Sequence, residues 1–256
     1  MLIENTLFGV IDKVADAIAR IQFHEPKEGY FVAFSGGKDS VVILDLIKKS
    51  GVKYDAHYHL TTVDPPELVR FIRKYHPEVE IVKPKMSMCK LIIHRKSPPT
   101  FKARYCCEKL KEGGGVGRFV ITGVRWEESV RRSRRTMVDT CIKSRKHYLH
   151  PIIDWLSDDV WEYIQDNRLD YCCLYDEGFT RIGCIGCPNG GEAGMRRDFE
   201  RWPKYRAMYI RTFQKMLIAS RDAGLLRETW KNPEAVLAWW MRRAVRKDKD
   251  QTTLFE

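Results

Sequence analysis

One stretch near the start of the chain brings together residue types that can hold an anion: Ser35-Gly36-Gly37-Lys38-Asp39-Ser40. An apolar run at 31–34 precedes it and an apolar-periodic stretch at 41–49 follows, which predicts a turn between a buried strand and a helix. The glycines let the backbone curl around a ligand, where N–H groups at a helix start converge on negative charge. The hydroxyls and the lysine suit phosphate. A plain glycine turn is the alternative.

The cysteines form the second set of residues that could do chemistry. Cys106 and Cys107 are adjacent, and Cys184 and Cys187 are separated by two residues. Four soft thiolates are enough to close a tetrahedral zinc site or to bind an iron–sulfur cluster. Eight cysteines in a chain without an evident secretory signal favour metal binding or catalysis over disulfides. Simple buried or redox-active thiols are the remaining interpretation.

Four further cysteines, Cys89, Cys141, Cys172 and Cys173, have no such spacing, and a free cysteine is usually a small buried apolar residue. Cys141 lies in a basic segment, which would lower its thiol pKa if it is exposed, so we take it as the candidate sulfur carrier. The pair Cys172-Cys173 is an alternative ligand set or persulfide carrier.

Positive charge is in excess, with 45 Lys and Arg against 34 Asp and Glu and a net charge of +11. Basic residues gather between 125 and 147 and again between 242 and 249. This pattern favours a polyanionic partner such as nucleic acid, and a merely solvated basic surface is the alternative.

The elements that must position these residues follow an alternating strand and helix pattern. The expected strands are 31–34, 54–60, 79–82, 119–122 and 148–153. This order predicts an α/β fold with a doubly wound parallel sheet, in which ligands bind beyond the carboxyl ends of the strands. Thr61, Thr62, Gly123 and Arg125 follow such strand ends and are therefore expected beside the glycine turn.

The flanking segments are expected to be helical. Apolar spacing predicts an amphipathic helix over 1–24 and a helical C-terminal extension, whose aromatic residues we expect to pack as a core and not as a base-stacking platform. We divide the chain into a nucleotide-binding domain at 1–165, a cysteine-rich loop at 166–195 and a helical extension at 196–256, with frayed last residues. No apolar run is long enough to cross a membrane, so we expect a cytosolic protein.

Three ordered motifs carry a family resemblance. The loop at 35–40 matches the S-G-G-x-D-S signature of the ATP pyrophosphatases, the family that also contains the sulfonucleotide (PAPS/APS) reductases. Residues 123–132 resemble its G-x-R-x-x-E-S-x-x-R segment, and 151–161 are similar to its P-[IL]-x-D-W-x-x-x-D-V-W element. The resemblance implies an adenine nucleotide α-hydrolase-like fold with five parallel strands.

The resemblance also implies roles for individual residues. The loop would hold ATP phosphates with Mg²⁺ on their oxygens, Lys38 would stabilise departing pyrophosphate, and Asp39 would orient the loop or the metal. Gly123 would let the nucleotide approach the backbone, while Arg125 and Arg132 would face phosphate or sulfate groups.

The order of the cysteines adds a cofactor to this expectation. The C-C…C-x-x-C pattern is similar to the [4Fe–4S] ligand set of the APS reductase branch and of DNA-phosphorothioation sulfur-transfer proteins, with Zn²⁺ as the alternative.

One missing motif distinguishes the sulfonucleotide reductases from the other members of the family that this chain resembles. Sulfonucleotide reductases carry their nucleophilic cysteine in E-C-G-[IL]-H near the C-terminus, and residues 188–256 contain no cysteine. We therefore expect an ATP-dependent sulfur transferase that adenylates an acceptor, tRNA or DNA, and takes sulfur from a donor such as a cysteine desulfurase. The alternatives are a sulfonucleotide reductase and a non-catalytic redox module that binds nucleotide and nucleic acid.

Overall fold

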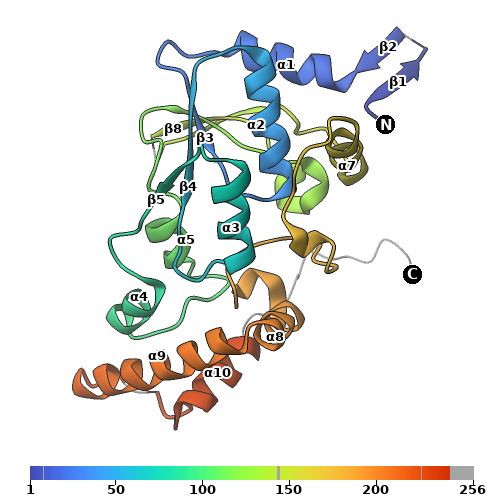
Figure 1. Cartoon of the computed structure of the whole chain (residues 1–256). Coiled ribbons are helices and arrows are strands. Elements are labelled where there is room, and N and C mark those ends of the chain that lie inside the picture. Colours follow the sequence, from blue (N-terminus) through green and yellow to red (C-terminus); the bar gives the residue numbers. More distant parts are fainter. Residues whose placement is uncertain (8, 143–144, 226, 243–256) are drawn as a thin grey trace, which may run out of the picture. The chain divides into compact units, whose positions relative to one another are not determined.

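The computed structural model describes residues 1–7, 9–142, 145–225 and 227–242 (Figure 1). The chain forms two compact units, which we describe separately. The first contains residues 1–59, 66–83 and 113–182, and the second contains 60–65, 84–112 and the chain from 183 onward. Both units are discontinuous, unlike the contiguous division predicted from the sequence. Residues 84–112 group with the C-terminal helices because α4 (Met88–Arg95) packs against α9 (Pro203–Asp222).

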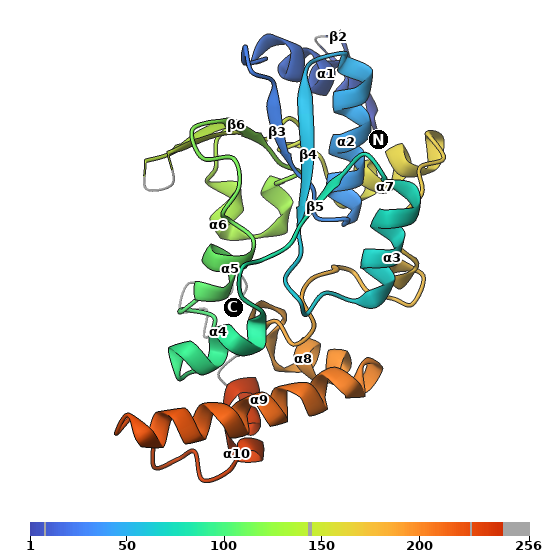
Figure 2. The ribbon, with the colours of Figure 1, turned by 60° about the vertical axis from the view of Figure 1, so that its left-hand side comes forward.

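A six-stranded sheet with the order β5-β4-β3-β6-β8-β7 forms the centre of the first unit (Figure 2). Its strands are β3 (Tyr30–Ala33), β4 (Tyr54–His59), β5 (Glu80–Val82), β6 (Phe119–Ile121), β7 (Val138–Cys141) and β8 (Lys146–Leu149). The first five in this order are parallel, which confirms the predicted α/β fold, and β7 adds an antiparallel edge to β8. The last strand was predicted at 148–153, but the observed strand β8 begins earlier, at Lys146, and ends at Leu149. It cannot extend through Pro151, because proline has no N–H to donate to a neighbouring strand.

The helices of the first unit follow the strands as a parallel sheet requires. They are α1 (Lys13–Phe23), α2 (Lys38–Ser50), α3 (Pro66–Tyr75), α6 (Val130–Ser133) and α7 (Ser157–Asp166), with short 3-10 turns η1 (Trp126–Glu128) and η2 (Cys173–Tyr175). Helix α2 packs against α1 and α7. It ends at Gly51, which adopts a left-handed conformation with φ of 73° that favours glycine.

The predicted helix over 1–24 is only half correct. The antiparallel strands β1 (Ile3–Thr6) and β2 (Gly9–Asp12) take the place of its first half, and α1 begins at Lys13. Gly9 has φ of 128°, a backbone state that a helix does not contain. The Asp12 carboxylate accepts the N–H groups of Val14 and Ala15, each at 3.0 Å, and so fixes the helix start at Lys13 and not near residue 1.

The second unit is helical. It contains α4, α5 (Tyr105–Leu110), η3 (Pro188–Gly190), α8 (Gly191–Arg201), α9 and α10 (Pro233–Arg242). Phe199, Tyr209, Phe213 and Trp240 are buried against one another, which confirms core packing for these aromatic side chains. The predicted frayed segment and most of the basic group at 242–249 lie outside the described residues. None of the described helices is long and apolar enough to span a membrane.

Candidate functional site

The glycine turn joins β3 to α2 as predicted. Gly36 has φ of 73°, and a Cβ atom there would lie 2.7 Å from the Leu68 side chain, so both backbone conformation and space require glycine. Gly37 precedes the first residue of α2 and offers no side-chain acceptor to the N–H groups at the helix start. The helix dipole places partial positive charge at this end of α2, where an anion would be stabilised.

The two serines hold this turn closed. The Ser35 hydroxyl donates to the Ser40 hydroxyl at 3.1 Å and accepts the Gly37 N–H at 3.3 Å. The Ser40 hydroxyl donates to the Gly37 carbonyl at 2.8 Å. Both hydroxyls thus lie at the start of α2, where they can turn toward a bound anion.

A compact set of charges lies beside the turn. The Asp39 Oδ1 atom accepts from Arg125 Nε at 2.7 Å and lies 3.1 Å from Lys38 Nζ. Arg125 also donates to Glu127 at 2.7 Å and is only 4% exposed. Burial acts to lower the pKa of Arg125, but the Asp39 and Glu127 carboxylates outweigh it and raise that pKa. One Asp39 oxygen therefore holds two cationic side chains at the start of α2.

The segment 123–132 also lies beside the glycine turn. A Cβ atom on Gly123 would lie 2.8 Å from the Asp39 carbonyl oxygen, so the backbones after β6 and at the start of α2 touch. The Arg125 N–H donates to Glu128 at 2.9 Å, and Glu128 pairs with Arg132. Arg132 therefore belongs to the same network through Glu128, without a direct contact to the turn.

One residue beside the glycine turn was not predicted from the sequence motifs. The Tyr175 hydroxyl, on η2, accepts the Lys38 N–H at 2.9 Å, at the point where an anion would bind α2. The ring of Trp161 packs edge-on against Tyr175 with 5.1 Å between ring centroids. Since Lys38 and Tyr175 are 137 positions apart and Tyr175 lies in no matched motif, no local sequence pattern could have joined them.

Two threonines predicted at the nucleotide site, Thr61 and Thr62, lie in the second unit. Thr61 Oγ1 accepts from Cys184 Sγ at 3.4 Å, and Thr62 Oγ1 accepts the Met88 N–H at 3.0 Å. Their contacts in the structure are therefore with the cysteine-bearing unit.

All four predicted metal-ligating cysteines lie in that second unit. Cys106 and Cys107 begin α5, and Cys184 and Cys187 flank Gly186. Gly186 has φ of 72°, and a Cβ atom there would lie 2.7 Å from the Phe199 ring. The Tyr209 hydroxyl donates to the carbonyl of Ile185 at 3.0 Å, so a buried aromatic core fixes this tight turn.

Basic side chains face the sulfur atoms. A hydrogen bond from Cys106 lowers the pKa of Cys107, and Arg104, which donates to Cys107 Sγ at 3.4 Å, acts in the same direction. Cys184 raises the pKa of Lys111, while burial raises the pKa of Cys184 itself. In the described part of the chain no three or more Cys, His, Asp or Glu side chains are arranged to hold a metal ion. Thiols are the donors that a soft metal or cluster prefers, but among the described residues these four sulfur atoms do not surround one point.

The candidate sulfur carrier Cys141 is not brought to the glycine turn. It ends β7 and pairs with Lys146, the first residue of β8. Strands β3, β6 and β8 are parallel, so the first residue of β8 lies at the opposite edge of the sheet from the last residue of β3. Cys141, which pairs with that first residue of β8, is therefore at the edge away from the glycine turn. The other three cysteines differ in exposure, with Cys172 buried, Cys173 exposed and Cys89 between the two.

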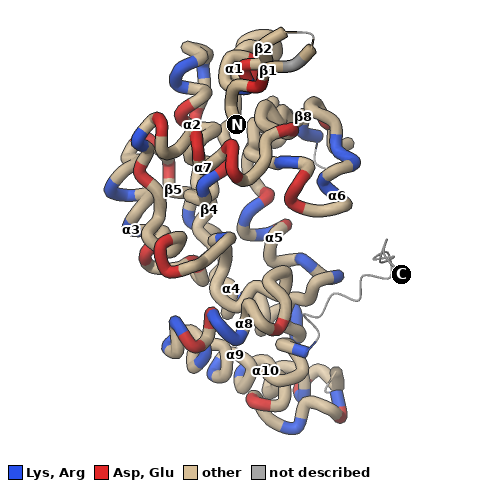
Figure 3. Tube along the Cα trace, turned by 90° about the vertical axis from the view of Figure 1, so that its right-hand side faces the viewer, with Lys and Arg blue, Asp and Glu red and all other residues tan. Residues whose placement is uncertain are grey.

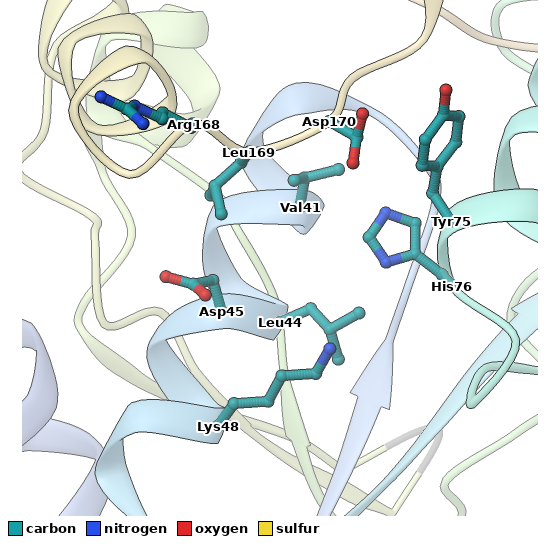
Figure 4. A pocket seen from close by; sticks show the side chains of 9 residues that line it. All are labelled: Val41, Leu44, Asp45, Lys48, Tyr75, His76, Arg168, Leu169 and Asp170. Carbon is teal, nitrogen blue, oxygen red and sulfur yellow. The ribbon is translucent and has the colours of Figure 1, made fainter.

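A separate pocket of about 180 Å³ lies in the first unit (Figure 4). It is lined by Val41, Leu44, Asp45 and Lys48 of α2, by Tyr75 and His76, and by Arg168, Leu169 and Asp170. Both ring nitrogens of His76 are buried without a hydrogen-bond partner, and burial lowers its pKa. No residue of the glycine turn lines this pocket.

The fold and the turn together define a nucleotide-binding α/β protein, and comparison with known proteins gives the family. Residues 29–190 match the phosphoadenosine phosphosulfate reductase domain, and the chain belongs to this family. It is 30% identical over 166 residues to an adenosine 5'-phosphosulfate reductase of Oceanobacillus iheyensis, covering 60% of this chain and 69% of that protein.

Two further similarities extend this comparison. The chain is 30% identical over 218 residues to an uncharacterised protein of Methanocaldococcus jannaschii, covering 77% of this chain but only 45% of that longer protein. A solved phosphoadenylyl-sulfate reductase of Candida auris, in a phosphate complex, shares the fold with a TM-score of 0.50 and 22% identity, over 66% of this chain and 88% of that one.

Proposed function

We propose that this chain is an ATP-dependent sulfur transferase that activates a nucleic-acid acceptor by adenylation. The observation that carries the proposal is the start of α2, where the hydroxyls of Ser35 and Ser40 and the side chain of Lys38 lie at the positive end of the helix dipole. Backbone donors preorganised at a helix start stabilise phosphate and a departing pyrophosphate alike.

The proposed activation step is a displacement at the α-phosphorus of ATP. An acceptor oxygen forms a bond to that phosphorus, and the bond to the pyrophosphate oxygen breaks. The helix start and Lys38 hold the charge that develops on pyrophosphate, while Mg²⁺ would bind the phosphate oxygens. The terminal sulfur of a persulfide donor then displaces AMP from the acceptor and forms a mixed disulfide with it. A second thiol attacks the donor sulfur of that disulfide and breaks its S–S bond, which leaves the transferred sulfur on the acceptor as a thiol and the donor oxidised to a disulfide. ATP thus yields AMP and pyrophosphate.

The cysteines support the second half of this proposal. Cys106, Cys107, Cys184 and Cys187 would hold a [4Fe–4S] cluster, which supplies redox or sulfur-binding capacity when bound. Arg104 and Lys111 offset the negative charge of the thiolates. Iron and sulfide content after anaerobic purification separates the cluster from zinc, the other metal that this donor set suits.

Reduction of a sulfonucleotide is the second candidate function. It is favoured by the similarity to adenosine 5'-phosphosulfate reductases, whose substrate also carries an adenylate. The same anion site at α2 and the buried Arg125 would then face the phosphosulfate. This candidate needs a thiol nucleophile, which another cysteine or a partner protein would supply.

Titration with ATP tests the nucleotide site common to both candidates. We expect Lys38→Ala to weaken ATP binding by about 10- to 100-fold, since a hydrogen bond to a charged group contributes about 1.5–3 kcal/mol. Lys27→Ala is the matched control, because Lys27 is exposed and lies outside the turn. Equal ATP affinity in both variants would show that the turn does not bind the phosphates.

A further inference from the structure

Positive charge is divided unequally between the two units. The first unit contains 22 Lys and Arg and 22 Asp and Glu, whereas the second contains 23 Lys and Arg and 12 Asp and Glu. The whole net charge of the chain therefore belongs to the unit with the cysteines, while the unit with the glycine turn is neutral. A charge excess confined to one unit indicates a polyanionic partner for that unit.

Part of this excess lies in a line on α9. Lys204, Arg211 and Lys215 are spaced by seven and four residues, so they project from nearly the same side of the helix. At the rise of an α-helix the row is about 17 Å long. All three side chains are exposed, and Figure 3 shows Lys and Arg along this helix. We call these three residues the α9 row.

The α9 row is available for a ligand. In the described chain no ion pair or hydrogen bond is formed by these three side chains. The acidic residues nearest in sequence are Glu200, four positions before Lys204, and Asp222, seven positions after Lys215, and neither pairs with the row. The opposite side of α9 packs against α4, α8 and α10, with Tyr209, Phe213 and Met216 buried. The helix is thus held rigidly by its apolar side and presents cations on the other.

The surroundings of the row indicate which form of nucleic acid it fits. Single strands and RNA loops are bound by stacking bases on exposed aromatic rings. Among the described residues of the second unit, the exposed large apolar side chains are Met86, Ile218 and Leu225, and none is aromatic. A straight row of cations without a stacking surface suits phosphates along the backbone of a double helix.

We infer that the α9 row docks the phosphate backbone of a double-stranded nucleic acid without reading its bases. This inference rests on the proposed nucleic-acid acceptor and assigns its docking surface. Each phosphate contact releases a counterion, so the affinity must fall with salt concentration in proportion to the number of contacts.

The test measures binding of a DNA duplex of about 20 base pairs, two turns of the helix, to the full chain at several salt concentrations and without ATP. In a triple variant with Lys204→Gln, Arg211→Gln and Lys215→Gln, the slope of log K against log salt should become shallower by about 0.9 for each contact removed. The matched control is Arg70→Gln, Arg73→Gln and Lys74→Gln, which removes three exposed charges from α3 in the first unit.

The outcomes are distinct. A shallower slope in the α9 variant alone supports the inference. Equal changes in both variants would show that only net charge matters, and equal binding of the single strand would exclude a double-helical partner; either result overturns the inference. ATP affinity of the α9 variant, measured in parallel, should equal that of the wild type, so failure of the docking surface is distinguishable from failure of the nucleotide site.

Discussion

Lys38 and Arg125 approach the same Asp39 oxygen from two parts of the chain, and both are almost fully buried. Removing one partner of such a buried set leaves an uncompensated charge. The arrangement therefore fixes the first turn of α2 in the geometry that an incoming phosphate needs. At this scale the Tyr175 hydroxyl is the group that competes with a ligand, since it already accepts the Lys38 N–H.

Substitution of Tyr175 by Phe tests this competition. The variant should bind ATP up to about fivefold more tightly, because one hydrogen bond of about 1 kcal/mol no longer has to be broken. ATP titration followed by Trp fluorescence measures it, with Trp161 packed against the ring. Tyr171→Phe is the control, because Tyr171 also packs on Trp161 but its hydroxyl donates to Asp176. Weaker binding in Tyr175→Phe would mean that the hydroxyl helps to hold the nucleotide.

At the scale of elements, His150 connects the ends of two strands. It follows β8, is fully buried, and shares a hydrogen bond of 2.7 Å with Thr122 after β6. Burial is the main reason that its pKa falls to about 4, and Arg135 acts in the same direction. The neutral imidazole therefore holds together the edge of the sheet from which the glycine turn emerges.

This shift predicts a loss of stability in acid. Between pH 6.5 and pH 4 the unfolded chain binds a proton at His150 that the folded chain does not, so the free energy of unfolding should decrease as pH falls, by up to about 3 kcal/mol from this residue. Urea unfolding at a series of pH values measures the decrease. It should be smaller in His150→Gln and unchanged in the exposed control His94→Gln; an equal decrease in all three proteins would contradict the assignment.

Regular elements with local signals could be predicted from the sequence, and long-range placements could not. Apolar runs and glycines predicted the strand–turn–helix at 31–49, and the structure contains it. The hairpin at 3–12 was missed because Leu7, Val10 and Ile11 match helical spacing, while the decisive features are Gly9 and the Asp12 cap. Tyr175 was missed for a different reason, namely that its only link to the site is tertiary.

At the scale of the whole molecule, the two units divide the sequence motifs between them. The unit with the sheet holds the glycine turn, Gly123 and Arg125, and the helical unit holds the four cysteines, both threonines and the charge excess. The sequence could not show this division because the second unit is assembled from three separate segments. In the proposed function the first unit activates with ATP, and the second holds the cluster and docks the acceptor.

The products formed from nucleotide test the central claim most directly. Anaerobically purified protein is incubated with Mg²⁺, ATP, a persulfide donor and duplex nucleic acid, and separately with adenosine 5'-phosphosulfate and a thiol reductant. We expect AMP and pyrophosphate from ATP, in amounts that the duplex increases and that Lys38→Ala abolishes, and no sulfite from the sulfonucleotide. Sulfite release without any pyrophosphate from ATP would contradict it and establish the reductase instead.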